Sequence, residues 1–439
     1  MHLFSPGTRL RLADGTTVTV GALLGAGGQG EVYRVRTARG AEMALKWYTA
    51  PALCADDAFH ASMQAKCEAG APSPVFLWPV ALTERRPDGS FGYIMPLRPD
   101  DFIELGDFFC IDRNPDAWFR SNMAKVCAAM RIADSFSRLH LTGCCYQDIN
   151  DGNFFVNPHT GEVLVCDNDN IVVDGTGHGI AGKPRYMAPE VIAGDTPRMT
   201  SDRLSLSIIL YRIFMTDHPF EGRATASATV MTPEAENRLF GAGAVFCHDP
   251  DNDSNRPDPA LHPNSALFWE QMPPVLRNAF CAALSRRALA EPKSRPSAAR
   301  WKAMMVALRA CLLSCRADRK DPLHDFLADS RPPGFCPRCG LPVSPFATLA
   351  LDNGTAYRLS SGKELFVDDG FIPAGICTML NVRGRGVVPG LENRSGRVWK
   401  VTVPGSRPAS AEPGCAVAFA DGVGIDFGNI KGTIIYPGV

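Results

Sequence analysis

The chain has 439 residues, of which 45% are hydrophobic and 21% are charged, as is typical of a globular protein rather than a disordered one. Its 45 Lys and Arg residues nearly cancel its 46 Asp and Glu residues, so nothing global attracts nucleic acid or an anionic membrane. The longest apolar run, at 204–215, is too short to span a bilayer, and residues 1–12 lack the apolar stretch of a signal peptide. The fifteen cysteines are scattered along the chain, a pattern that fits reduced thiols better than a framework of disulfide bonds. We therefore expect a cytoplasmic protein of about two to four domains.

Three regions differ in their sequence pattern. Residues 10–110 carry short strand-like runs that Gly and Pro interrupt. Residues 116–310 are mostly helical in pattern, with apolar residues near a 3.6-residue period. From residue 334 onward, short strand-like runs alternate with glycine-rich turns, and the polar stretch 317–335 reads as a linker. The pattern predicts an α+β chain that ends in a small all-β module.

A glycine-rich turn is the first candidate for chemistry. Gly25, Gly27 and Gly30 form a G-x-G-x-x-G pattern, and the residues after it continue as a strand rather than as the helix of a dinucleotide-binding loop. A glycine-rich hairpin allows backbone N–H groups to close over phosphates. Lys46 follows on an apolar strand. It is either a cation for those phosphates or an edge lysine that faces water.

Further motifs follow in a fixed order. Asp148 and Asn153 are five residues apart in a loop after a long helix, and a strand-turn-strand then ends at Asp167. With these residues the sequence resembles the eukaryotic-like (Hanks-type) Ser/Thr protein kinases. The later landmarks of the resemblance are Gly182–Glu190, which ends in Ala-Pro-Glu, Asp202, His218–Phe220 and Arg295–Ser297. The resemblance covers about residues 16–312 and implies a bilobal kinase fold.

The resemblance implies ATP and Mg²⁺ as cofactors. Asp148 would accept the proton of the substrate hydroxyl, while Asn153 and Asp167 would bind Mg²⁺. Lys46 would hold the α- and β-phosphates. The residues expected around the rest of the nucleotide are Gly25, Gly27, Gly30, Val32, Ala44, the gatekeeper Met95, the hinge residues Pro96 and Arg98, and Phe155.

Several positions depart from the family pattern. The His-Arg-Asp motif reads Tyr146-Gln147-Asp148, so a phosphorylated activation loop has no arginine partner there, and we expect activity that does not depend on loop phosphorylation. The Asp-Phe-Gly motif reads Asp167-Asn168-Asp169. The helix glutamate that normally pairs with the strand lysine is taken to be Glu68, one turn past Gln64, with a solvated helix-end acid as the alternative.

A second departure concerns positive charge beside the catalytic aspartate. Related Ser/Thr kinases carry a lysine two residues after the aspartate, where this chain has Asn150. Lys183, seven residues before Glu190, stands where these kinases usually have threonine, and in the family that position lies beside the catalytic aspartate. We expect Lys183 to supply the missing charge as a third catalytic residue; the alternative is an exposed loop lysine.

Four cysteines near the end of the kinase-like region suggest a structural zinc site. Cys311 and Cys315 are four residues apart on a predicted helix, and Cys336 and Cys339 form a C-x-x-C pair. His324 is a spare ligand. Buried structural thiols are the alternative.

The predicted domains are an N-terminal extension at 1–15, a kinase domain at 16–312 (N-lobe 16–98, C-lobe 99–312), a linker with a candidate zinc knuckle at 313–342, and a β-rich module at 343–439. The segment 221–274 is an insert in the helical lobe. The tail resembles those of bacterial kinases linked to tellurite resistance, which implies a von Willebrand A-type protein and a phosphatase as partners.

The leading hypothesis is a bacterial ATP- and Mg²⁺-dependent protein serine/threonine kinase acting on a partner protein. A nucleotide-binding pseudokinase scaffold is the alternative, and a small-molecule kinase on the same fold is a third reading. Lys46, Asp148, Asn153 and Asp167 favour the enzyme.

Overall fold

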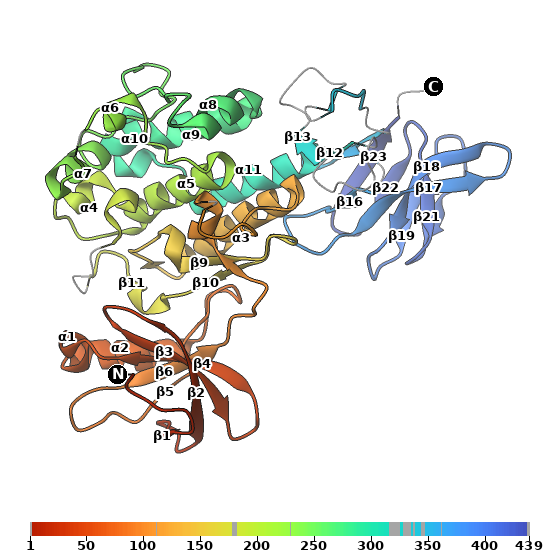
Figure 1. Cartoon of the computed structure of the whole chain (residues 1–439). Coiled ribbons are helices and arrows are strands. Elements are labelled where there is room, and N and C mark those ends of the chain that lie inside the picture. Colours follow the sequence, from red (N-terminus) through yellow and green to blue (C-terminus); the bar gives the residue numbers. More distant parts are fainter. Residues whose placement is uncertain are drawn as a thin grey trace.

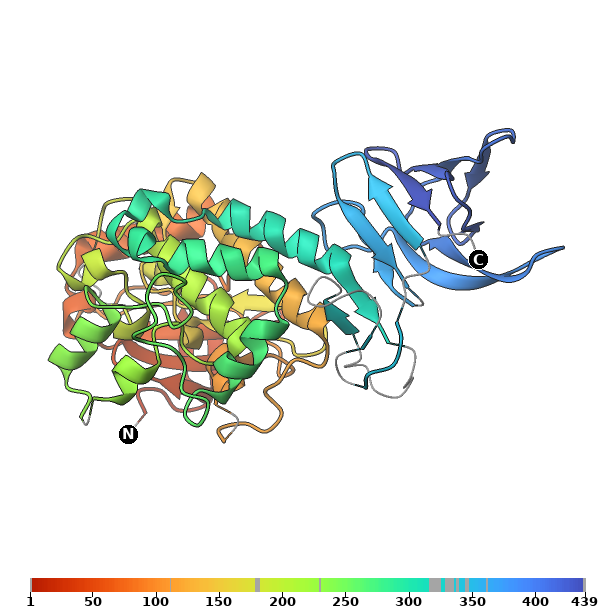
Figure 2. The same cartoon turned by 90° about the horizontal axis from the view of Figure 1, so that it is seen from above.

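The computed structural model describes residues 2–110, 112–177, 182–228, 230–315, 325–327, 335–336, 339–343, 347–360 and 362–436. In these ranges the chain forms a strand-rich lobe, a helical lobe and a β-rich module in sequence order (Figure 1). The view from above in Figure 2 shows the module at one end, beyond the last long helix.

The first lobe is built on one antiparallel sheet of six strands, in the order β1-β2-β3-β4-β6-β5. Alternating apolar residues give this sheet two buried faces: Tyr33 and Val35 on β3 lie in one core, with Trp47 from β4. Phe59 and Met63 of helix α2 cover the other face. The elements are β1 (Arg9–Arg11), β2 (Thr17–Ala26), β3 (Gly30–Thr37), β4 (Glu42–Tyr48), α1 (Pro51–Cys54), α2 (Asp57–Ala69), β5 (Ala81–Leu82) and β6 (Gly92–Pro96).

The segment expected to be a separate N-terminal extension is integrated into this lobe. Strand β1 pairs with β2 from Arg9 to Arg11. Phe4 is buried and packs edge-on against Trp47, with ring centroids 4.9 Å apart. Residues 2–12 therefore complete the sheet and one of its cores.

The second lobe is mostly helical and surrounds the long helices α3 and α5. Helix α3 begins at Ser121, whose hydroxyl accepts a hydrogen bond from the Ala124 N–H. Its buried face includes Met130 and Phe136, at the helical spacing that the sequence predicted. The helices are α3 (Asn122–Leu141), α4 (Pro189–Ile192), α5 (Met199–Met215), α6 (Arg223–Ala226), α7 (Pro233–Phe240), α8 (Pro263–Phe268), α9 (Pro274–Leu284), α10 (Arg286–Ala290) and α11 (Ala298–Cys311).

Short strands and single turns of 3-10 helix connect the helices of this lobe. The short strands are β7 (Ile103–Glu104), β8 (Cys144–Cys145), β9 (Phe154–Val156), β10 (Val163–Val165) and β11 (Val172–Val173). The 3-10 turns of the lobe are η1 (Leu105–Phe109), η2 (Asp151–Asn153), η3 (Asn168–Asn170), η4 (Pro184–Tyr186), η5 (Trp269–Gln271) and η6 (Pro292–Ser294). Asn153 lies in η2, Asp167 directly precedes η3, and Lys183 directly precedes η4.

Two antiparallel sheets make up the third region, and every regular element described between 347 and 436 is a strand. Their shared core includes Leu349, Leu391, Trp399, Phe419 and Ile434. The strands are β14 (Ala347–Leu351), β15 (Ala356–Leu359), β16 (Glu364–Leu365), β17 (Gly375–Val382), β18 (Gly386–Asn393), β19 (Trp399–Thr402), β20 (Ala409–Ala411), β21 (Ala416–Ala418), β22 (Gly424–Asp426) and β23 (Lys431–Ile435).

Helix α11 joins the helical lobe to this β-rich module. Arg309, fully buried on α11, donates to the carbonyls of Gly370 at 2.8 Å and Asp368 at 3.0 Å. In return, Lys363 Nζ donates to the carbonyls of Ala310 at 2.8 Å and Leu312 at 2.5 Å, which caps the end of the helix. Each side thus satisfies buried polar groups of the other.

Two further strands connect the regions. Strand β12 (Leu312–Ser314) follows α11 and pairs with β13 (Asp325–Leu327). The Asp325 carboxylate accepts from the Asn122 N–H at 2.9 Å and the Met123 N–H at 2.7 Å, and so caps the start of α3. Among the described helices, none combines the length and the apolar character that crossing a membrane requires.

Candidate active site

The loop that carries Asp148 is fixed by a buried carboxylate from α5. Asp202 accepts hydrogen bonds from the Tyr146 N–H at 2.7 Å and the Gln147 N–H at 3.1 Å. Its third contact is with His140 at the end of α3, whose Nε2 lies 3.1 Å from Asp202 Oδ2. Gln147 adopts a left-handed backbone conformation with φ of 72°, which these two N–H bonds hold in place.

Asp148 lies at the centre of a small hydrogen-bond network. Its Oδ1 accepts from Asn150 Nδ2 at 2.8 Å and from the Lys183 N–H at 3.1 Å. Asn153 Nδ2 donates to the Asp148 carbonyl at 2.8 Å, which leaves the amide oxygen of Asn153 as the donor for a cation. Burial raises the pKa of Asp148 above the ordinary aspartate value, although these hydrogen bonds oppose the shift. A carboxylate with a raised pKa is suited to accept a proton.

Asp167 follows β10, and its carboxylate lies 3.3 Å from Lys46 Nζ on the first lobe. Its backbone is left-handed, with φ of 52°, and 44% of its side chain is exposed. The next side chain, Asn168, is completely buried and donates its amide to the carbonyls of Leu77 and Val165 at 2.9 and 3.0 Å. Asn168 thus replaces the packing phenylalanine of the family motif with two hydrogen bonds to backbone.

Lys46 meets both aspartates of this segment. Its Nζ lies 2.8 Å from Asp169 Oδ2, 3.3 Å from Asp167 Oδ1 and 3.0 Å from Gln29 Oε1. Burial lowers the pKa of Lys46, but the carboxylates of Asp169 and Asp167 outweigh it and raise the pKa above that of an exposed lysine. Lys46 is therefore a buried lysine that pairs with carboxylates, not the edge lysine of the alternative interpretation.

The structure does not bring Glu68 to this lysine. Glu68 is exposed near the end of α2 and accepts a hydrogen bond from Gln64 Nε2 at 3.2 Å. The buried residue of α2 nearest this network is Met63, whose sulfur lies 3.9 Å from the Tyr48 hydroxyl. A four-residue step along a helix keeps Glu68 on the face of Gln64, which is also exposed.

Asp169 is the buried carboxylate that pairs with Lys46. Its buried carboxylate accepts from Lys46 and, at 2.8 Å, from the Tyr48 hydroxyl. Burial raises the pKa of Asp169, but Lys46 reverses this and holds the pKa below the ordinary value. Helix α2 still reaches this segment, because Lys66 Nζ donates to the Asp169 carbonyl at 2.7 Å.

The glycine-rich turn joins β2 and β3 as expected. A Cβ at Gly25, Gly27 or Gly28 would meet nothing within 4 Å, so the surface of the turn is open to a ligand. Gly30 is different: a Cβ there would lie 1.9 Å from the Trp47 carbonyl oxygen, so a side chain is sterically excluded. Gln29 reaches from the turn to Lys46.

The residues expected around the adenine lie on the two facing lobes. Ala44 and Met95 are register partners on β4 and β6, and both are buried. Val32 is half-buried on β3 and lies opposite Lys46 in the register of β3 with β4. Pro96 ends β6, and the Arg98 guanidinium lies 4.4 Å from the ring centroid of Phe155.

The described parts of the activation segment are held by polar contacts that need no phosphate. Gln147 Nε2 donates to the Thr176 carbonyl at 2.8 Å. Arg185 pairs with Glu221 at 2.5 Å and with Glu236 at 2.7 Å, both from the 221–274 insert. Further along, Arg295 and Glu190 form a bidentate pair with distances of 2.6 and 2.8 Å.

Lys183 lies beside the catalytic loop, as the family positions implied. Its backbone contacts Asp148, and its Nζ pairs with Asp151 Oδ1 at 2.6 Å. Arg212 shares the same carboxylate through Oδ2 at 2.9 Å. Burial raises the pKa of Asp151, but the hydrogen bond from Lys183 and the charge of Arg212 bring it below the ordinary value. Lys183 and Arg212 thus share one carboxylate, and Glu104 lies near enough to Asp151 and Lys183 to interact with both charges.

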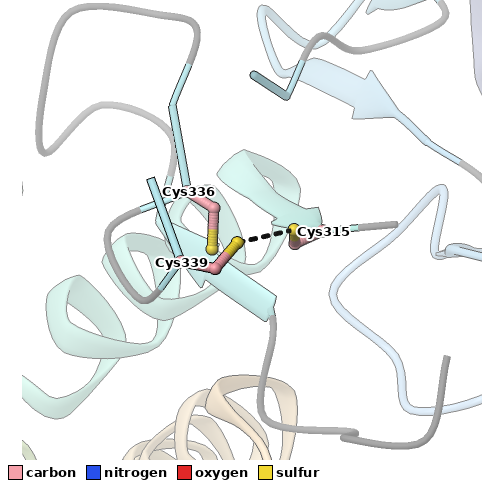
Figure 3. A group of neighbouring side chains, drawn as sticks. All are labelled: Cys315, Cys336 and Cys339. Carbon is pink, nitrogen blue, oxygen red and sulfur yellow. Dashed lines mark hydrogen bonds between the residues drawn. The ribbon is translucent and has the colours of Figure 1, made fainter. Parts of the chain in front are cut away.

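Three of the four predicted zinc ligands come together. The thiol groups of Cys315, Cys336 and Cys339 lie within 4.8 Å of one another (Figure 3). Cys311 is not in this group, because the chain changes from helix to the extended strand β12 directly after it. His324 lies outside the described residues.

Sequence reasoning missed Tyr48, Lys66 and the role of Asp169. Asp169 was visible only as the last residue of an altered motif, where the family has glycine. Nothing in the sequence marked Lys66 or Tyr48, because each acts through a partner more than 100 positions away.

Comparisons with known proteins define the class of the catalytic region. Residues 102–301 match the family model described as protein kinase domain. These residues include Asp148, Asn153, Asp167 and the segment that ends at Glu190, all described above. The match and the curated relatives confirm the predicted protein kinase fold of mixed helices and strands.

The relatives include bacterial and animal kinases. Protein kinase YegI of Escherichia coli O157:H7 is 26% identical over 392 residues, 84% of this chain and 55% of that protein. Serine/threonine-protein kinase Sgk1 of Xenopus tropicalis is 30% identical over 131 residues, 29% of this chain and 30% of that protein. The PknI kinase domain of Mycobacterium tuberculosis aligns with a TM-score of 0.43 and 21% identity, covering 69% of this chain and 98% of that one. The chain spans about half the length of the YegI proteins that it matches.

Proposed function

We propose that this chain is a protein kinase that uses ATP and Mg²⁺ to phosphorylate Ser or Thr hydroxyls of a partner protein. The observation that carries the proposal is the grouping of the motif residues: Lys46 contacts Asp167 at 3.3 Å, and Asp167 is close enough to Asp148 for its charge to act on that carboxyl. The exposed Asp167 carboxylate and the Asn153 amide oxygen are the hard donors that Mg²⁺ prefers, and the open glycine turn fits phosphates. Bound Mg²⁺ would neutralise charge that develops on the phosphates.

Each residue then has a defined task. Asp148 orients the substrate hydroxyl and takes its proton, for which its raised pKa is suited. Lys46 holds the α- and β-phosphates, which would replace Gln29 as its partner on the side of the glycine turn. Lys183, which pairs with Asp151 beside the Asp148 loop, stabilises the transferring phosphoryl group.

Asp169 acts as a positioning residue in this scheme. In the absence of an acid on α2 that contacts Lys46, Asp169 sets the position of the lysine from the metal-binding segment itself. Lys66 joins α2 to the backbone of that segment. The coupling between helix and lysine therefore runs through Asp169 instead of through a direct ion pair. A movement of α2 therefore shifts Lys46 less than it would if a glutamate on that helix held the lysine through a direct ion pair.

The polar contacts of the activation segment support activity without loop phosphorylation, since Gln147 and the insert hold its described parts. The family resemblance further suggests a von Willebrand A-type protein as substrate, a cognate phosphatase, and a cytoplasmic location. The retained catalytic set argues for an enzyme over a pseudokinase scaffold, since a scaffold requires no base at Asp148.

Transfer of radiolabelled phosphate from [γ-³²P]ATP tests the proposal. Wild type and Asp148→Ala are each incubated with Mg²⁺ and a mixture of casein and a candidate von Willebrand A-type protein. We expect labelled Ser or Thr with wild type and a loss of about 10²- to 10⁴-fold in the variant, the range for a general base. Equal Mg²⁺-ATP binding by both proteins with no transfer by wild type would favour the scaffold.

A further inference from the structure

The junction between the helical lobe and the β-rich module carries a cluster of three thiols that the kinase chemistry does not use. Cys315 follows β12, and Cys336 and Cys339 come later in the chain, before the first strand of the module. Cys336 is 2% exposed and Cys315 is 8% exposed, and both pack against Leu313 and Val343. Figure 3 shows the three side chains converging on one point from two segments.

The backbone around Cys336 and Cys339 has the form of a tight turn. The Cys336 N–H donates to the Leu341 carbonyl at 2.8 Å, and the Gly340 N–H donates to the Cys336 carbonyl at 2.8 Å. Gly340 has a φ of +72°, a conformation that glycine adopts at no steric cost. The turn holds the two thiol groups of the C-x-x-C pair on the same side, which is the spacing of structural zinc knuckles.

The sulfur–sulfur distances fit an ion better than a disulfide. Cys315 Sγ and Cys339 Sγ are 3.6 Å apart, and the three sulfur atoms all lie within 4.8 Å of one another. Two thiolates bound to a tetrahedral zinc ion at about 2.3 Å are separated by about 3.8 Å. A disulfide would require about 2.05 Å. The observed distance matches the first value and is far from the second.

We propose that Cys315, Cys336 and Cys339 bind a structural Zn²⁺ ion. Three thiolates supply the soft, anionic ligands that zinc favours, and a divalent cation balances the charge that they would otherwise bring into an apolar cluster. The site differs from the four-cysteine site predicted by sequence, because Cys311 belongs to the end of α11 and is not among the three grouped thiols.

The position of the ion defines its role. Cys315 directly follows β12, which is paired with β13 and through Asp325 with the start of α3. The turn at Cys336 leads into the module. A metal ion that joins these two segments fastens the module to the helical lobe. Its contribution to stability is local to the junction, and the nucleotide cleft does not depend on it.

Metal content of the purified full chain, measured by inductively coupled plasma mass spectrometry, tests the site. We expect about one Zn²⁺ per chain in wild type and less than a tenth of that in Cys336→Ser and Cys339→Ser. Cys415→Ser is the matched control for the exposed Cys339, and Cys311→Ser separates the three-thiol site from the four-cysteine site. Both control variants should retain the full zinc content.

Two further measurements cover variants that fail to fold. Wild type treated with a zinc chelator should show faster hydrogen exchange in β12 and β13, with unchanged Mg²⁺-ATP affinity. Cobalt substitution should give a thiolate-to-metal charge-transfer band that weakens in Cys315→Ser. Absence of zinc from wild type, iron or copper in its place, or loss of zinc in Cys311→Ser would overturn the proposal. These measurements do not depend on phosphoryl transfer, so the zinc proposal can be rejected without rejecting the kinase function, and the reverse.

Discussion

Two lysines, one in the nucleotide cleft and one at the module junction, are almost equally buried but have opposite surroundings. Lys46 is 5% exposed and Lys363 is 4% exposed. Lys46 faces the carboxylates of Asp169 and Asp167, whereas the acceptors of Lys363 among the described residues are the backbone carbonyls of Ala310 and Leu312. Burial therefore lowers the pKa of Lys363 to about 7, while the two carboxylates keep Lys46 charged.

The difference teaches that the role of a buried lysine is set by its partners rather than by its burial. A lysine with excess negative charge around it can remain charged and still attract phosphates when they arrive. A lysine that caps a helix with carbonyl contacts has a structural task, and near neutral pH it can lose its charge. The other groups that influence Lys363 are the thiols of Cys377 and Cys311 and the cations Arg358 and Arg309.

Replacing each lysine by methionine is the sharpest way to break this comparison. Lys46→Met should lower kcat/KM for ATP by about 10³-fold, the upper range for losing one electrostatic stabiliser. Lys363→Met should change it by less than about twofold, because the junction does not touch the nucleotide. Initial rates at several ATP concentrations measure both, with circular dichroism as the check on folding. Equal losses in the two variants would contradict the assigned roles.

Removing Lys183 tests whether a second cation acts on the transferring group. Lys183→Ala should lower kcat by about 10²-fold with little change in ATP affinity, since Lys46 and the metal site remain. Asn150→Lys in the same background should restore part of the rate. The matched control is Lys293→Ala, an exposed lysine in the same lobe. An unchanged kcat in Lys183→Ala would reduce this residue to a loop lysine.

Asp169→Asn should lower kcat/KM by roughly 10- to 100-fold, because Lys46 loses the charge that positions it. Met63→Glu places an acid on α2 at the buried position nearest to this network and should restore part of the rate in the Asp169→Asn background. Met63→Gln in the same background is the uncharged control. Rescue by glutamate and not by glutamine separates positioning from a merely structural effect. Asp169→Asn with wild-type kinetics would remove the role.

The smallest effect is the pH dependence of stability at the junction. The folded pKa of Lys363, about 7, is below the value of about 10.4 expected when unfolded, so the unfolded state binds more protons between these limits. The free energy of unfolding should therefore rise with pH in this window, by up to about 1.4 kcal/mol per pH unit. Urea unfolding at pH 7.5, 8.5 and 9.5 should show the rise in wild type but not in Lys363→Met. Lys400→Met, an exposed lysine of the module, should behave as wild type.

The kinase motifs could be predicted from sequence because each task needs a particular residue type at a fixed spacing. The pair Asp148 and Asn153 lies in one short loop, so a five-residue offset was sufficient to find it. The order of strand-rich and helical regions also followed from local patterns, and α3 was found from its apolar period.

Long-range partners could not be predicted in the same way. Asp169 and Lys46 are 123 positions apart, and no local pattern states which acid a buried lysine will meet. The prediction of Glu68 relied on family spacing, and the structure instead places Met63 toward the core. The cysteine prediction assumed that the helix continued through Cys315, whereas α11 ends at Cys311.

The different roles of Asp167 and Asp169 are tested most directly by titration calorimetry. ATP is titrated into Asp167→Ala and Asp169→Ala, with and without Mg²⁺. Because Asp167 is the exposed carboxylate and Asp169 is buried against Lys46, Asp167→Ala should lose the Mg²⁺-dependent part of ATP binding. Asp169→Ala should bind ATP more weakly but keep its dependence on Mg²⁺. Wild-type Mg²⁺-ATP binding by Asp167→Ala, together with loss of Mg²⁺ dependence in Asp169→Ala, would contradict the assignment of the site.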